Sequence, residues 1–170
     1  AQIDANLTSA RLAAPQLNWA KPEDASASLK ANIVFRADKS IEIANIDATG
    51  PGMKALGRLV IGGGGIREAD FKKLQLGQRN DFVLSYRDNA ERGIVFEAKG
   101  RAIDAGGFLE GDDDEGRAPK SERKRPVSIK ADMDLAYLQG DVWFTGVKFD
   151  YASDGYNLTA FNVDASADAS

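Results

Sequence analysis

The segment Gly140–Ala160, GDVWFTGVKFDYASDGYNLTA, alternates apolar and polar residues on both sides of a Ser-Asp-Gly turn. Alternation of this kind places every second side chain on one side of a strand, so the segment predicts a β-hairpin with one apolar face. Val142 and Phe144, before Gly146, have even numbers, whereas Val147, Phe149 and Tyr151, after it, have odd numbers; Trp143 lies on the parity opposite Phe144. A β-bulge, which adds one residue to a strand, would keep both sets on the same face.

Two further segments share the pattern of the hairpin's first strand. In residues 43–48, 71–76 and 144–149, an apolar residue is followed by two spacers, a second apolar residue, one spacer and a third apolar residue. Each segment is followed by a turn and an alternating strand. The sequence therefore predicts a weak internal repeat of a bulged strand, a turn and a second strand.

Period-two alternation extends over most of the remaining chain. It covers residues 3–7, 27–37, 53–61, 82–86, 94–102 and 127–137, separated by turns rich in Gly, Pro, Asn and Asp. The best helix candidate, Ile66 to Leu76, lacks a wide apolar stripe and matches the repeat, which favours a strand. We therefore predict an all-β fold, an antiparallel meander of about ten long strands with almost no helix.

Composition narrows the range of functions. The chain has 170 residues, enough for a single domain, and a net charge of −4, which argues against nucleic acid as a partner. It contains neither Cys nor His, so thiolate chemistry is excluded and the commonest general base and metal ligand are missing. We expect no enzymatic activity and no cofactor. No apolar run approaches the roughly 18–20 residues of a membrane span.

We expect residues 1–170 to form one β-groove segment of a longer protein, because the chain starts without Met and stops in a strand-like run. Residues 110–126 hold clustered acids followed by clustered bases and no large apolar side chain, which predicts a mobile, solvated loop. Four consecutive acids, Asp112 to Glu115, could bind calcium. They lack the spacing of an EF-hand loop, so solvent exposure is the favoured interpretation.

Other candidate sites are weak. Gly62 to Gly65 lacks the lysine and hydroxyl of a phosphate-binding loop and fits a turn better. Asp132 and Asp134 share one strand parity, as a pair of catalytic carboxylates would, but they lie on the polar side, where exposed acids are ordinary. Trp19 and Trp143 could stack on a sugar ring, although packing at a sheet edge or under a loop is the commoner role of an indole.

Taken together, the predicted strands form a sheet with one apolar face, and no helix is predicted that could cover this face. One solution is closure as a β-sandwich or barrel, and the other is a strongly curved, open sheet, a groove or half-barrel, filled by an apolar ligand such as lipid tails. Ala and Gly are frequent on the apolar parity, which would pack a closed core thinly but leave room in a groove. We favour the open sheet and keep the closed sandwich as the alternative.

Several segments resemble a known family. The run ANLTSARL at 5–12, LNWAKP at 17–22, the strand opening at 27–29, FKKLQLG at 71–77 and GRAIDA at 100–105 are similar to the AsmA-like proteins of Gram-negative bacteria, including their DUF3971 and TamB-like relatives. The resemblance implies a periplasmic protein, anchored in the inner membrane by a segment not present here, whose β-groove carries phospholipids towards the outer membrane in outer-membrane biogenesis.

The leading hypothesis is therefore a groove segment that binds phospholipid acyl chains and reaches the inner and outer membranes through parts outside this chain. The alternative is a structural, adhesive or glycan-binding β-sandwich. The predicted groove lining consists of the large apolar residues on the strand parities that face inwards: Leu29, Ile33, Phe35, Met53, Leu59, Ile61, Phe82, Leu84, Tyr86, Phe96, Ile129, Met133, Leu135, Phe144, Phe149 and Leu158.

Overall fold

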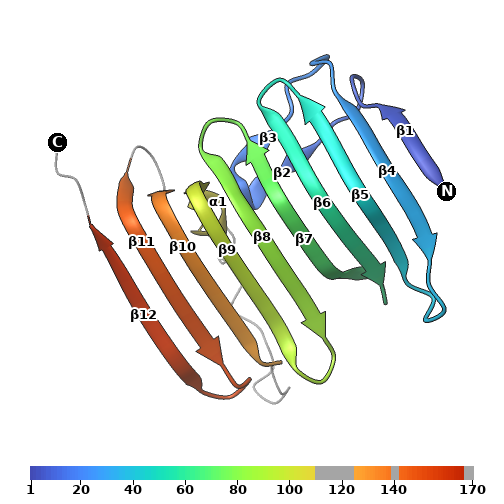
Figure 1. Cartoon of the computed structure of the whole chain (residues 1–170). Helices are drawn as coiled ribbons and strands as arrows, with labels where there is room; N and C mark the ends of the chain where they lie inside the picture. The colour runs from blue at the N-terminus through green and yellow to red at the C-terminus, as the bar shows by residue number, and fades with distance from the viewer. Residues whose placement is uncertain (110–124, 139–141, 167–170) are drawn as a thin grey trace, which may run out of the picture.

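The computed structural model describes residues 1–109, 125–138 and 142–166, in which ten strands form one open, curved sheet (Figure 1). From one edge to the other, the strands are β1 (Gln2–Asn6), β4 (Ser28–Phe35), β5 (Ile41–Gly50), β6 (Met53–Gly62), β7 (Gly65–Leu76), β8 (Asn80–Asn89), β9 (Gly93–Asp104), β10 (Val127–Tyr137), β11 (Trp143–Ser153) and β12 (Leu158–Ser166). The prediction of an open all-β sheet is confirmed. The helix candidate at 66–76 is strand β7.

One pair of strands departs from the antiparallel meander. β9 and β10 run parallel, whereas every other neighbouring pair in the ten-stranded sheet is antiparallel. The chain leaves β9 through the short helix α1 (Gly106–Leu109) and returns to the start of β10. Residues 110–124 of the predicted mobile loop lie outside the described residues. At the loop's described end, Arg125 forms an ion pair with Asp88, and the carbonyl of Pro126 accepts a hydrogen bond from Ile94 N at 2.8 Å.

All three predicted bulges are present. The pairing register shifts between Ile43 and Ile46, between Phe71 and Leu74, and between Thr145 and Lys148. Two of the bulges contain a residue with positive φ, Asn45 at 53° and Gly146 at 58°. Asn and Gly are the residues that adopt this left-handed conformation most readily. The bulges let apolar side chains on both sides of the irregularity face the same way.

Residues 7–27, here called the strap, cross one end of this apolar face. The strap contains β2 (Ala13–Ala14), a 3₁₀ turn, η1 (Pro15–Leu17), and β3 (Trp19–Ala20), which lie behind the sheet in the view of Figure 1. Leu12, Leu17 and Trp19 pack on a cluster of buried apolar residues that includes Ala55 and Leu76. Leu17 also contacts a second cluster, built around the buried side chains of β8 to β10.

Buried polar groups hold the strap in place. Asn80, only 2% exposed, donates a hydrogen bond of 2.9 Å to the carbonyl of Leu17 and accepts one of 2.9 Å from the backbone N–H of Asp104. The Asp104 carboxylate in turn lies 3.4 Å from the side-chain amide of Asn18. Lys21 is buried as well, and its ammonium group donates to three strap carbonyls at 2.9–3.1 Å. Because such groups are costly to bury unpaired, the bonds of Asn80 and Asp104 hold the strap on the sheet, and those of Lys21 hold the strap's own conformation.

This architecture answers how the apolar face is covered. The strap covers the end of the face near the β5–β6 and β7–β8 turns, where Trp19 lies against Gly77. Within the described residues, no second large sheet packs on the ten-stranded sheet, because the only other sheet is the two-residue pair β2–β3. The closed β-sandwich kept as the alternative is therefore not the fold found.

Candidate functional site

The end of the apolar face away from the strap carries a continuous row of cross-strand partners. Directly paired residues share a face of the sheet, so the register defines the row without ambiguity. We call this row the open band, and it runs across nine strands: Ile33, Ile43, Leu59, Ala69, Tyr86, Phe96, Ile129, Tyr151 and Phe161. Ala69 is buried, Phe161 is 59% exposed, and the others are half-buried.

The predicted lining residues divide into three groups by exposure. Met53, Phe82 and Met133 are buried in the two clusters on which the strap packs, and they are 7%, 3% and 1% exposed. Phe35 and Leu158 are 75% and 59% exposed, and Ile61 is 37% exposed. The remaining residues are half-buried: Leu29, Ile33, Leu59, Leu84, Tyr86, Phe96, Ile129, Leu135, Phe144 and Phe149. The structure thus divides the predicted lining between a covered and an open part.

Leu135 needs a correction, because its register places it on the other face. It pairs with Ala102, which pairs with Asp81 on the opposite face of the sheet, called here the charged face. Its neighbour Ala136 is instead buried in the same cluster as Met133. The parity changes because the β8–β9 register shifts by one residue beside Asp81, and simple alternation along β10 gave no sign of this shift.

Several residues of the open surface were missing from the predicted lining. Ile43 and Tyr151 belong to the open band, as does Phe161. Ile66, 47% exposed, pairs with Ile61 at the edge of the band. Their signal was present in the sequence, since Ile43 opens the first repeat and Tyr151 follows the third. Strand pairing was needed to show that they lie beside the predicted residues.

The opposite face carries a ladder of ion pairs across β5 to β8. Arg58 of β6 contacts Glu42 of β5 at 3.8 Å and two acids of β7, Glu68 at 2.9 Å and Asp70 at 2.7 Å. Arg87 of β8 closes the ladder on Asp70 at 2.8 Å. Cross-strand pairs of opposite charge stabilise a sheet. This face is therefore a self-paired, solvated surface.

Two side chains of the charged face are shielded from water, that of Val60 almost completely and that of Asp70 in part. Val60 pairs with Glu42 and Glu68 and is only 1% exposed although it lies on the charged face. Burial raises the pKa of Asp70, but hydrogen bonds and charge from Arg87, with the charge of Arg58, outweigh it and hold the pKa below its usual value. The ladder thus keeps Asp70 ionised.

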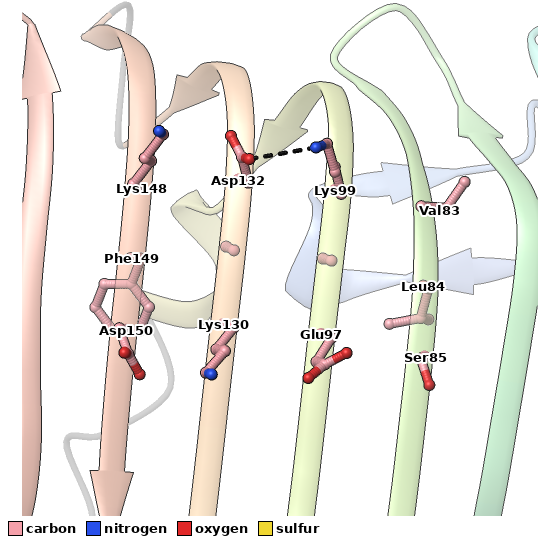
Figure 2. A pocket seen from close by; sticks show the side chains of 12 residues that line it. Val83, Leu84, Ser85, Glu97, Lys99, Lys130, Asp132, Lys148, Phe149 and Asp150 are labelled. Carbon is pink, nitrogen blue, oxygen red and sulfur yellow. Dashed lines mark ion pairs between the residues drawn. The ribbon is translucent and has the colours of Figure 1, made fainter.

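A hollow of about 530 Å³ crosses β8 to β11 (Figure 2). The hollow is lined by two rows of cross-strand partners. One row consists of Val83, Lys99, Asp132 and Lys148, and the other of Ser85, Glu97, Lys130 and Asp150. Positive and negative side chains alternate along each row, and each charge faces an opposite charge in the other row, so the charges in the hollow sum to zero. Figure 2 shows Lys99 and Asp132 pointing towards one another, at 3.5 Å.

The hollow does not assemble the carboxylate pair considered above. Asp132 lies in it and is paired with Lys99, whereas Asp134 is not among the residues that line it. Within the described ranges, no group of three or more Asp or Glu side chains could hold a metal ion. The candidate calcium ligands, Asp112 to Glu115, lie outside the described residues.

The remaining candidates take structural positions. Gly63 and Gly64 form the β6–β7 turn with φ of 62° and 88°, as expected for a turn. Trp19 belongs to the strap and packs on the sheet. Trp143 starts β11, is 37% exposed and pairs with Tyr137, whose ring lies 4.8 Å from the guanidinium of Arg79.

A membrane-crossing helix is not among the described elements, since none is both long and apolar enough. Comparison of the chain with family models, with curated proteins and with solved structures gave no match. The apolar face, with the strap at one end and the open band at the other, is thus the candidate site that the geometry itself defines.

Proposed function

We propose that this chain binds phospholipid acyl chains on the open band, as a segment of a periplasmic lipid-transfer protein of the AsmA-like type that its sequence resembles. The observation that carries the proposal is the uneven cover of one apolar face. The strap packs on one end of the face, and the other end presents the open band. A lipid tail bound on the open band would shield that end of the face from water, as the strap shields the other end.

The energetic argument favours an apolar occupant. Full burial of a Leu-sized or Phe-sized side chain is worth about 1.5–3 kcal/mol, and the open band presents eight large ones in partial contact with water. A sixteen-carbon acyl chain gains on the order of 12 kcal/mol on leaving water, at about 0.8 kcal/mol per methylene. Both surfaces are therefore stabilised when they meet, without a polar ligand group.

The dimensions of the band also suit an acyl chain. Neighbouring strands lie about 4.8 Å apart, so nine strands extend roughly 38 Å across the sheet. One leaflet of a bilayer's hydrocarbon core is about 15 Å thick, which is the length over which an acyl chain extends. An acyl chain can thus lie across the strands within the band.

Head-group selectivity is expected to be weak. The charged side chains of β5 to β11 described above lie on the opposite face, where the ladder and the alternating rows pair with one another. A head group would remain in solvent beyond the band. Anchoring in the inner membrane, and transport between the inner and outer membranes, would depend on parts outside this chain and are proposed from the family resemblance alone.

The test compares two lysine substitutions at neighbouring positions of β10. Ile129 lies in the open band, whereas Ser128 pairs with Val95 on the charged face. The purified chain and its Ile129→Lys and Ser128→Lys variants would be examined by native mass spectrometry and lipid extraction. We expect phospholipid with the wild type and with Ser128→Lys, and its loss from Ile129→Lys. A lipid-free wild type, or equal lipid in both variants, would reject the proposal.

A further inference from the structure

Four apolar side chains form a row at the end of the sheet opposite the strap. Phe35, Ile41, Ile61 and Ile66 come from β4, β5, β6 and β7, and the register places them side by side. We call this row the tip. Phe35 is 75% exposed, Ile66 47% and Ile61 37%. Soluble proteins rarely gather large apolar side chains on their surface without a binding role.

The tip is continuous with the open band. Two residues before Phe35 along β4 lies Ile33, and two residues before Ile61 along β6 lies Leu59, both members of the band. Among the described residues, the turns at 36–40 and 63–64 follow the tip along the chain, and a Cβ on Gly63 or Gly64 would meet no atom within 4 Å. Gly63 and Gly64 therefore leave the β6–β7 turn open at this end of the band.

The charges beside the tip are mixed. Arg36 pairs with Glu42 at 2.7 Å, and Arg67 pairs with Asp38 at 3.6 Å. Lys39 is exposed and forms no ion pair within the described part of the chain. An apolar row flanked by largely balanced charges suits the interface of a bilayer, where the apolar groups enter and the charged groups stay at the level of the head groups.

We propose that the tip contacts the surface of a lipid bilayer and is the place where acyl chains pass between the bilayer and the open band. The contact itself stands on the tip's geometry, whereas its role in loading rests on the proposed function. A protein partner fits less well, because a standard interface uses roughly 20–30 residues on each side. The tip offers four large apolar side chains, at most comparable with one acyl anchor, which gives weak and reversible membrane binding.

The test uses two adjacent residues on opposite faces. Phe35 belongs to the tip, whereas Val34, 46% exposed, pairs with Glu42 on the charged face. Co-sedimentation with vesicles of phosphatidylcholine, with and without phosphatidylglycerol, would be measured for the wild type, Phe35→Ser and Val34→Ser. We expect Phe35→Ser to weaken vesicle binding about tenfold and Val34→Ser to change it less than twofold. Added phosphatidylglycerol should have little effect, because the tip's charges are largely balanced.

The outcomes separate this inference from the proposed function. A wild type that does not bind vesicles, or equal binding by both variants, overturns the inference even if the purified chain retains lipid. A wild type that binds vesicles through Phe35 but carries no lipid supports the tip and rejects the open band as a lipid site. If Phe35→Ser instead changes the oligomeric state measured by light scattering, the tip is a contact between copies of the chain and the inference fails.

Discussion

At the scale of single residues, the charged face makes the stability of the fold depend on pH. A hydrogen bond from Lys73 is the largest influence on the pKa of the Asp81 carboxyl, and Arg101 adds a second bond at 3.4 Å. Both lower this pKa from its ordinary value, against an opposing effect of burial. A carboxyl whose pKa is lower in the folded than in the unfolded chain stabilises the fold above the unfolded value and loses this contribution as the pH falls.

The stabilising contribution of Asp81 should therefore be lost as the pH falls below about 4, the pKa region of an unperturbed aspartate. Replacing it in Asp81→Asn should lower the free energy of unfolding at neutral pH and flatten its decline under acid, as measured by urea unfolding at several pH values. The matched control is Asp134→Asn, because Asp134 is exposed and forms no ion pair in the described part of the chain. A decline as steep in Asp81→Asn as in the wild type would contradict the prediction.

At the scale of the strand, the bulges were predictable because they leave a mark on hydrophobic spacing. Two spacers between Ile43 and Ile46, where alternation requires one, would turn one of these isoleucines to the charged face of a regular strand. An extra residue removes that conflict, and Asn45 takes it up in a left-handed conformation at φ 53°. Spacing alone therefore located the irregularity, even though the pairing partners were unknown.

The Asn45 bulge predicts a reversed order of substitutions. In the interior of a strand, Val is normally favoured over Gly. At Asn45 the positive φ strains a β-branched residue but not Gly. We expect Asn45→Val to lower the free energy of unfolding by about 1–3 kcal/mol, and Asn45→Gly to change it little.

Chemical denaturation of both variants measures this difference. Asp47 supplies the control, since it is exposed, lies on the same strand and is not among the residues with positive φ. Asp47→Val should be at least as stable as Asp47→Gly, because both variants lose the same ion pair with Lys54. The same order of Val and Gly at both positions would show that the bulge does not constrain Asn45.

Hydrophobic periodicity could not predict two features of the fold, the strap and the parallel pairing of β9 with β10. The strap has no repeating pattern, because Leu12, Leu17 and Trp19 lie on short pieces of β2, η1 and β3 that follow the surface they cover. Its position depends on polar bonds to Asn80 and Asp104, which are distant in sequence. The parallel pairing of β9 with β10 was also missed, because alternation shows which face a residue occupies but not the direction of a strand.

At the scale of the whole molecule, the apolar face continues to the edge of the sheet. On β12, Phe161 and Val163 are 59% and 54% exposed, and Phe161 meets the ring of Phe149 edge-on at 6.2 Å. Their neighbour Asn162 pairs with Asp150 on the charged face. An uncovered apolar face and an unpaired edge strand both promote association in water. The same surface that would bind lipid should therefore bind other copies of the chain once lipid is removed.

We accordingly expect the delipidated chain to self-associate with increasing concentration, and an added single-chain phospholipid to return it to the monomer. Sedimentation velocity measures both effects. Phe161→Lys should weaken the association, because it places a charge on the apolar face, whereas Asn162→Lys adds the same charge to the opposite face and should leave it intact. Both variants alter the same edge strand by one lysine. Equal weakening would therefore mean that the edge, not the apolar face, holds the copies together, and a delipidated chain that stays monomeric would mean that the face is stable in water without any cover.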